Sequence, residues 1–238
     1  MSLRLFVAPG VAPGARVDLD EDESHYLRRV RRARDGARVD LLDGSASWSA
    51  TVIGGDSRRS TVEVLGRLPE PAPARALTLL LGLPEPQAAL DAITGATELG
   101  AVRVILTTCA RSQGSAPTPA RIERVVRASQ RQCGRPSAPA IVGPLPLAAA
   151  AEAAAGARFF AWEALRGRDD RLVLAAGAPV SFAVGPEGGF TTTEAAALEA
   201  ASFTPLALGP WTLRTETAAL VGLARLLFAP DEALTAAG

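Results

Sequence analysis

Short runs of alternating apolar and polar residues fill the first 70 or so positions of the chain. We expect strands at four of them, RLFVA (4–8), ARVDLL (37–42), SWSATVIG (47–54) and STVEVLGRL (60–68). Asp43-Gly44 and Gly54-Gly55 are typical of turns. The segment DESHYLRRVRR has helical spacing, with Ser24 as its candidate N-cap and with His25 and the arginines opposite the apolar side. This part predicts a small β-barrel or sandwich.

The pattern changes after the proline-rich segment RLPEPAPARAL, which cannot join a central sheet. LTLLLGL and VRVILTT are expected as buried strands on either side of the helix PQAALDAITGATELG, which predicts a βαβ unit and a parallel sheet. An arginine-rich helix, a proline-rich connection, an alanine-rich helix near 147–155, strands at RFFAWEA, PVSFAVG and PLALG, and a helix over about 215–228 follow. We therefore expect a two-domain α+β protein, with domains over 1–71 and 72–238.

Two strand-to-helix loops of the second domain share one layout. PVSFAV leads through GPEGGF into TTTEAAALEAA, whose Thr191 and Glu194 form a capping box. PLALG leads through Gly209-Pro210 into a helix that begins near Thr215. For either loop alone, a tight strand-to-helix turn is the preferred interpretation. Two of them on neighbouring strands predict one cleft, because open α/β sheets bind ligands at the carboxyl ends of their strands.

The GPEGGF loop narrows the class of ligand. Its spacing does not fit the dinucleotide fingerprint G-x-G-x-x-G. Glu187 would repel a phosphate at the helix N-terminus where backbone N–H groups otherwise attract one. A cationic ligand with hydroxyls, amino groups and an adenine edge suits the loop better, and S-adenosylmethionine has these features.

Composition excludes several chemistries. All 25 basic residues are arginine, so there is no P-loop, Schiff-base or general-base lysine. One histidine, His25, and two cysteines, Cys109 and Cys133, are too few for a Cys/His metal site or a disulfide framework, and no metal is expected. The sequence has neither a membrane-spanning apolar stretch nor a signal-peptide layout, so we expect a cytoplasmic protein.

The formal net charge is zero, but the arginines are clustered. Six arginines lie between Arg28 and Arg38, and seven lie between Arg103 and Arg135. On a helix, part of the second cluster forms a stripe opposite an apolar face, made of Arg121, Arg124, Arg127, Arg131 and Arg135. Solvated helix faces usually mix charges of both signs, so a stripe of one sign favours a nucleic-acid partner over an ordinary surface.

The motifs HYLRRVRR, ATELGA, QCGR, AVGPEGGF and LGPWTLRTETAAL occur in this order and resemble the RsmE family of ribosomal RNA methyltransferases over nearly the whole chain. GPEGGF and LRTETA are the most specific of them. The resemblance implies methylation of N3 of a uridine in 16S rRNA of the small ribosomal subunit, with S-adenosylmethionine as cofactor. It further implies an N-terminal PUA-like β-barrel that binds RNA, a C-terminal α/β SPOUT domain with a deep trefoil knot, and a homodimer.

The resemblance also implies site residues. The cofactor is expected at Glu163, Gly185, Pro186, Glu187, Gly188, Gly189, Leu208, Gly209, Leu213 and Arg214. Together with the arginine clusters, it places RNA at His25, Arg28, Arg32, Arg111, Arg124, Arg127, Arg131 and Arg135. We expect Arg214 to be catalytic and to stabilise the anion that forms when uracil N3 loses its proton. The alternative is that Arg214 only orders its loop through Glu216.

Two departures from the family leave a second hypothesis open. Gly95 and Ala96 stand where members commonly have lysine before ATELG, and ASQRQCGR at 128–135 lacks both glutamates of the usual EAAEQCGR, with Ala128 and Arg131 in their places. A non-catalytic RNA-binding or ribosome-assembly protein on the same scaffold is the alternative function. A small-molecule enzyme that uses a nucleotide is disfavoured by the arginine stripe and by the missing phosphate motifs.

Overall fold

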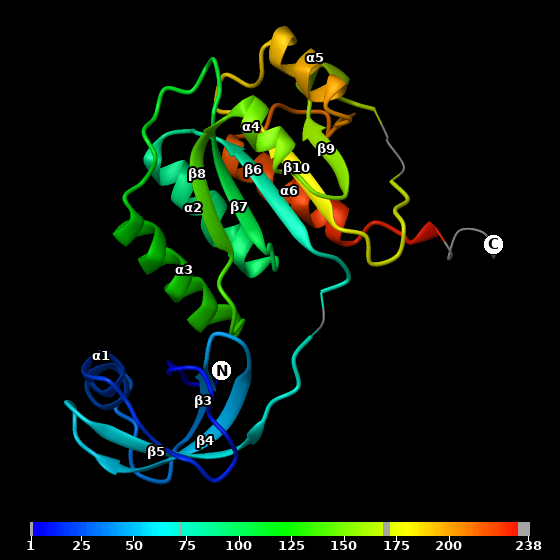
Figure 1. Ribbon diagram of the computed structural model, residues 1–238. Coiled ribbons are helices and arrows are strands. Elements are labelled where there is room, and N and C mark those ends of the chain that lie inside the picture. The colour runs from blue at the N-terminus through cyan, green and yellow to red at the C-terminus, as the bar shows by residue number, and fades with distance from the viewer. Residues whose placement is uncertain (1, 72, 169–171, 233–238) are drawn as a thin grey trace. The chain divides into compact units, whose positions relative to one another are not determined.

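The computed structural model describes residues 2–71, 73–168 and 172–232. It divides the chain into two compact units, each with its own sheet (Figure 1). The first unit is Met1–Ala72 together with Arg127–Ala138, and the second is Pro73–Val126 together with Pro139–Gly238. The sequence pattern does not indicate that a segment from beyond residue 72 would join the first unit.

The first unit is a five-stranded sheet in the order β1-β3-β4-β5-β2. Its strands are β1 Arg4–Phe6, β2 Arg16–Asp18, β3 Arg38–Leu42, β4 Ser47–Gly55 and β5 Ser60–Arg67. β1 pairs with β3 in parallel and the other pairs are antiparallel. Alternate side chains of the strands point into one core that contains Leu5, Leu41 and Val62. The four expected strands are confirmed, whereas β2 is too short for its pattern to be recognised.

The helix of the first unit begins earlier than the sequence predicts. α1 (Glu21–His25) continues directly into η1 (Tyr26–Val30), which is a π-helix. The expectation that Ser24 caps it is wrong, because the Asp20 carboxylate accepts from the Glu23 amide at 2.7 Å and is the N-cap. Ser24 is buried, and its hydroxyl accepts from the Ser60 amide at 2.9 Å, which ties the helix to β5.

The second unit is a six-stranded parallel sheet in the order β11-β9-β10-β6-β7-β8. Its strands are β6 Leu77–Gly82, β7 Arg103–Thr108, β8 Ala140–Pro146, β9 Ala157–Ala161, β10 Val180–Val184 and β11 Thr204–Leu206. Its helices are α2 Pro86–Glu98, α4 Leu147–Glu152, α5 Thr192–Ala200 and α6 Thr215–Leu227; α3 (Pro119–Cys133) belongs partly to each unit. The parallel sheet and the expected βαβ unit are confirmed, and the trefoil knot stays a prediction.

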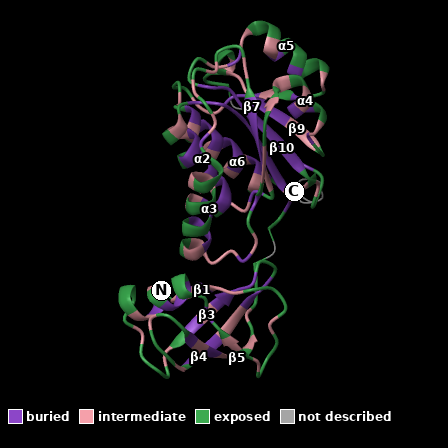
Figure 2. Cartoon of the chain, turned by 60° about the vertical axis from the view of Figure 1, so that its left-hand side comes forward, coloured by how far each residue is buried: buried purple, intermediate pink, exposed green. Residues whose placement is uncertain are grey.

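Helices cover both faces of this sheet, so that its central strands are buried (Figure 2). α2 and α6 pack over β6 and β10, and α4 and α5 pack on the opposite face. Among the described residues, no helix has the length and apolar character that a membrane span requires.

The expectation of a proline-rich connection between α3 and α4 is wrong, because this segment contains β8. β8 pairs only with β7 and forms an edge of the sheet. An edge strand tolerates proline, since one of its sides needs no backbone donors. The prolines therefore predicted a loop where the chain forms an edge strand.

Two glycines allow α6 to pack closely. A Cβ at Gly95 in α2 would lie 2.0 Å from Leu220 Cδ2, and one at Gly222 would lie 2.1 Å from Phe182 Cε1. A side chain at Gly95 would require Leu220 of α6 to move, and one at Gly222 would collide with the ring of Phe182 in β10. The departure at Gly95 therefore matches the close packing of α2 against α6 in this chain.

Candidate cofactor cleft and nucleic-acid surface

The loops that follow β9, β10 and β11 line one cavity of about 630 Å³, including its open mouth. The two matching loops were expected on neighbouring strands, which is wrong because β9 lies between β10 and β11. Three strand ends therefore build the cleft, and the loop after β9 contributes Trp162, Glu163 and Arg166.

Most residues expected to bind the cofactor line this cavity. They are Glu163, Gly185, Pro186, Glu187, Gly189, Leu208, Gly209 and Leu213. Gly188 and Arg214 are not among its lining residues, although each is next to one in the sequence. Further lining residues that were not predicted from the sequence include Trp162, Arg166, Phe190, Trp211 and Thr212. Their proximity to the motifs was the available signal, but it does not tell which side of a loop faces the cleft.

The GPEGGF loop makes a tight turn on itself. The Gly189 amide donates to the Pro186 carbonyl at 2.7 Å, and Gly189 has a φ of +66°, which favours glycine. A Cβ at Gly185 would lie 2.9 Å from the Gly189 carbonyl carbon, so this position has no room for a side chain. The backbone of the loop therefore forms one wall of the cavity.

Neighbouring loops hold GPEGGF from outside. The Glu187 carboxylate accepts a hydrogen bond at 2.8 Å from the amide of Glu85, which lies in the connection between β6 and α2. Arg111, which follows β7, donates from Nη1 to the Gly188 carbonyl at 2.6 Å. A Cβ added at Gly188 would lie 3.1 Å from Cδ of Arg111. Glu187 thus braces the loop as well as lining the cleft, and Arg111 contacts the loop along its side chain.

The capping box of α5 is confirmed. Together with the contacts of Glu187 and Arg111, it forms a clamp that holds the GPEGGF loop. Thr191 and Glu194 bond reciprocally, and the Glu194 carboxylate also accepts from the Ala110 amide at 2.7 Å. Burial raises the pKa of Glu194, but the hydrogen bonds from Thr191 and Ala110 outweigh it and leave the pKa below its usual value. Burial and the charge of Glu194 raise the pKa of the Cys109 thiol to about 12. Glu194 therefore stabilises the clamp at neutral pH, and this stabilisation is lost as the pH falls through its lowered pKa.

Replacement of Arg111 by alanine is expected to weaken binding of S-adenosylmethionine by about 5- to 10-fold, because the loop loses a charge-assisted hydrogen bond of roughly 1–1.5 kcal/mol. Isothermal titration calorimetry measures the effect. Arg121→Ala is the matched control, since the guanidinium of Arg121 donates to Gln87 on α2 and not to the GPEGGF loop. Unchanged cofactor affinity together with weakened RNA binding would instead assign Arg111 to RNA, as the sequence predicts.

The second loop is also held in place. The Gly209 carbonyl accepts from the Gly167 amide at 3.2 Å, and Thr212 Oγ1 accepts from Arg166 Nη1 at 2.9 Å. Arg214 stands at the N-cap position of α6 and is exposed. Within the described parts of the chain its guanidinium has no hydrogen-bond or ion-pair partner, Glu216 included. The side chain is therefore available for a ligand next to the helix N-terminus.

The lining of the cavity fits an amphipathic cation. Val184, Leu206 and Leu208 supply apolar surface, while Glu163 and Glu187 supply carboxylates. S-adenosylmethionine has a positive sulfonium, a positive ammonium and an apolar adenine face, which these groups complement. A phosphate would face both carboxylates. No cluster of metal-ligating side chains occurs in the described residues.

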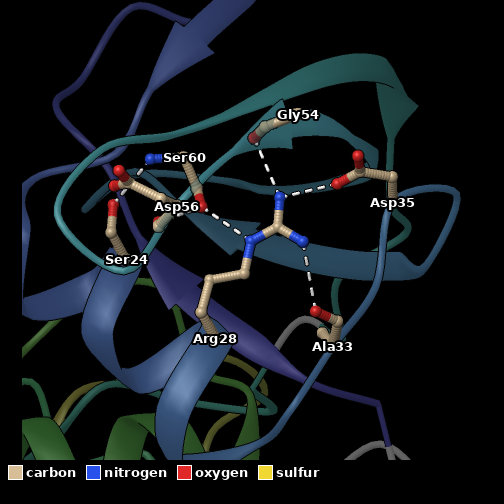
Figure 3. A network of polar contacts seen from close by, with 7 residues as sticks. All are labelled: Ser24, Arg28, Ala33, Asp35, Gly54, Asp56 and Ser60. Carbon is tan, nitrogen blue, oxygen red and sulfur yellow. Dashed lines mark hydrogen bonds and ion pairs between the residues drawn. The ribbon is translucent and has the colours of Figure 1, made fainter.

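In the first unit, Arg28 is committed to internal contacts (Figure 3). Its guanidinium donates to Ser60 Oγ, to the carbonyls of Ala33 and Gly54, and to Asp35 at 2.7 Å. Only 13% of the side chain is exposed. Arg28 therefore ties the helix to β4 and β5 and has few donors left for a phosphate.

Arg127 and Arg131, at the end of α3, meet a buried carboxylate. Glu23 is 1% exposed, and its Oε1 lies 2.6 Å from Arg131 Nη2 and 3.2 Å from Arg127 Nη2. The Arg131 guanidinium also lies 4.0 Å from the ring centroid of Tyr26, and that of Arg127 lies 4.3 Å from the ring centroid of Phe6. The arginine at position 131, which departs from the family motif, thus forms an ion pair with Glu23 inside the first unit.

The other cations expected to bind RNA differ in exposure. His25, Arg32 and Arg124 are exposed. Arg32 has a φ of +54°, a conformation uncommon for residues other than glycine and frequent at functional sites. Arg135 is half-buried, and burial lowers the pKa of its guanidinium. The exposed cations are therefore the best candidates for direct contact with phosphate.

Comparisons with known proteins agree with these features. Residues 70–227 match the family model described as an RNA methyltransferase domain, and residues 19–65 match one described as an RNA methyltransferase PUA domain. The ribosomal RNA small subunit methyltransferase E of Synechocystis sp. is 31% identical, over 95% of this chain and 77% of the relative. That of Mycobacterium bovis is 33% identical, over 88% of this chain and 85% of the relative.

A solved structure shows the same fold. The ribosomal RNA small subunit methyltransferase E from Neisseria gonorrhoeae, bound to S-adenosyl methionine, superposes with a TM-score of 0.83 at 22% identity. The match covers 95% of this chain and 97% of that chain. The expected fold class, a PUA-like first domain and an α/β second domain, is confirmed.

Proposed function

Since the chain belongs to the ribosomal RNA small subunit methyltransferase E family, we propose that it transfers the methyl group of S-adenosylmethionine to N3 of a specific uridine in 16S rRNA. The observation that carries this proposal is the cleft at the ends of β9, β10 and β11, which the GPEGGF and LGPWTLRTE loops line together. Residues 1–71 are proposed as the RNA-binding domain and residues 72–238 as the methyltransferase domain.

The cofactor supplies an electrophilic methyl group when it is bound. The backbone of 185–189 and the second loop at Leu208, Gly209 and Leu213 would hold it, and the Glu163 and Glu187 carboxylates complement its positive charge. Because neighbouring loops already fix GPEGGF, little conformational entropy is lost on binding.

Arg214 is proposed to act on the uracil. N3 carries a proton that must leave before or during attack, and the negative charge then spreads over the uracil carbonyls. The Arg214 guanidinium, which has no partner in the part of the chain that the structure describes, lies beside a helix N-terminus, where it would stabilise this charge and lower the proton affinity of N3. Its position outside the cavity lining agrees with a role toward the RNA rather than toward the cofactor.

We expect exposed cations to set the salt dependence of RNA binding. Arg32→Gln and Arg124→Gln should each weaken rRNA binding and reduce the slope of log K against log salt by about 0.7–0.9, as expected for one lost phosphate contact. Filter binding over a salt series measures this slope. Arg59→Gln is the control, because Arg59 is exposed but pairs with Asp18. Unchanged slopes in both variants would mean that these arginines are ordinary solvated side chains that do not contact RNA phosphates.

Further features of the proposal follow from the family resemblance. The protein is proposed to be a homodimer, which sedimentation velocity tests, and to act in the cytoplasm on the small ribosomal subunit or its rRNA. Mass mapping of 16S rRNA from a deletion strain tests the activity, and loss of one methyluridine is the expected result.

The alternative is a non-catalytic RNA-binding or ribosome-assembly protein. It rests on the departures at Gly95, Ala96, Ala128 and Arg131. In this chain Gly95 leaves room for Leu220, and Arg131 pairs with Glu23, so these two departures have a packing and a charge partner of their own. Calorimetry with S-adenosylmethionine separates the two functions. Absence of cofactor binding, with 16S rRNA methylation unchanged in the deletion strain, would support the alternative.

A further inference from the structure

We propose that the indole of Trp211 is the surface on which the target uracil stacks during methylation. This inference rests on the proposed function and adds a substrate-positioning residue to it. Trp211 lies in the second loop, at Gly209–Leu213, and lines the cavity.

Trp211 is unusually exposed for its size. Its side chain is 77% exposed, although tryptophan is highly buried on average in folded proteins. The exposure does not result from an untethered loop, since Gly209 accepts from Gly167 and Thr212 accepts from Arg166 on either side of the indole. A large apolar surface is thus held in water at the edge of a ligand cavity, which is typical of a binding site.

The chemistry of the reaction calls for such a surface. N3 lies on the Watson–Crick edge of uracil, so it can be methylated only in a base that is unpaired and turned out of its helix. A base in this state has lost its stacking neighbours, and RNA-binding proteins commonly replace them with aromatic side chains. An indole next to the cofactor cleft is placed to do this.

The charges around Trp211 favour RNA over another protein surface. Arg166, which donates to Thr212 in this loop, and Arg214, which follows the loop at the N-cap of α6, are both exposed arginines. The guanidinium of Arg214 has no partner among the described residues. Aromatic and cationic side chains that alternate in this way are typical of single-stranded nucleic-acid sites.

The test compares Trp211→Ala and Trp211→Phe with the wild type. We expect Trp211→Ala to lower kcat/KM for 16S rRNA by about 10- to 100-fold, and Trp211→Phe to retain most of the activity, because stacking needs an aromatic face. S-adenosylmethionine affinity should change less than about twofold. Phe228→Ala is the matched control, since Phe228 is also 77% exposed but does not line the cavity.

A second measurement isolates the contact with the base. RNA fragments with either uridine or an abasic site at the mapped target position are bound to wild type and to Trp211→Ala. The wild type should lose about 10-fold in affinity on the abasic RNA, and the variant should lose little.

Three outcomes would overturn the inference without affecting the proposed function, which wild-type methylation tests separately. The first is full rRNA methylation by Trp211→Ala. The second is an equal loss of cofactor affinity, which would mean that the indole stacks on adenine. The third is dissociation of a wild-type dimer in the variant by sedimentation velocity, which would mean that a second copy of the chain covers Trp211.

Discussion

Replacement of Arg214 by alanine is expected to lower kcat for rRNA methylation by about 100- to 1000-fold, the usual cost of removing one group that stabilises charge in a transition state. Cofactor affinity should change less than about threefold, because Arg214 is not among the residues that line the cavity. Single-turnover methylation and calorimetry with S-adenosylmethionine measure the two quantities on the same protein.

A conservative variant and a control variant distinguish a catalytic role of Arg214 from a general effect of losing an arginine. Arg214→Lys keeps the charge but not the planar fork, so it should recover only part of the rate. Arg67→Ala removes an exposed arginine from β5 and should leave kcat unchanged. Equal losses of cofactor binding and methylation in Arg214→Ala would reassign Arg214 to the cofactor, or to ordering its loop.

Replacement of Glu23 by alanine is expected to destabilise the first unit by about 2 kcal/mol and to lower its melting temperature by roughly 8–16 °C. Glu23 is 1% exposed and pairs with Arg131 and Arg127, so its removal leaves two arginines without their counter-charge. The full cost of a broken buried pair is not expected, since these arginine side chains are 21% and 44% exposed. Thermal unfolding followed by circular dichroism measures the effect.

Glu21→Ala is the matched control, because Glu21 lies in the same helix turn but is exposed and makes no ion pair with the described residues. It should lower the melting temperature of the first unit by only about 2–4 °C, because one exposed carboxylate near a helix N-terminus contributes about 0.5 kcal/mol. Equal effects of the two variants would show that the helix, and not the buried pair, carries the stability.

Several elements of the fold could be predicted because their causes are local. The run Leu77–Gly82 is buried at every position, and a strand covered on both faces reads as a continuous apolar segment. The Thr191 and Glu194 box lies within one helix turn, so its residue types and spacing specify it. The cofactor loops were found for the same reason, since glycine and proline restrict the backbone where they stand.

The contacts that complete the site could not be predicted in this way. Glu187 meets the Glu85 amide across 102 positions, and Arg111 meets the Gly188 carbonyl across 77. The sequence indicated that Glu187 opposes phosphate, but not that it braces its own loop. It also assigned Arg28 to RNA, whereas the partners of Arg28 come from three segments that only the folded sheet brings together.

Local pattern and motif therefore predicted most of the strands and helices, the two loops that line the cleft and the chemical class of the ligand. The fold alone decided that β9 lies between the two loop-bearing strands, that Trp211 is exposed, that Arg131 is paired, and that the Arg214 side chain has no partner within the described residues. The physical reason is that backbone preferences act over a few residues. The availability of a charge or an aromatic face depends instead on partners that lie, for Arg131 and Glu23, 108 positions apart.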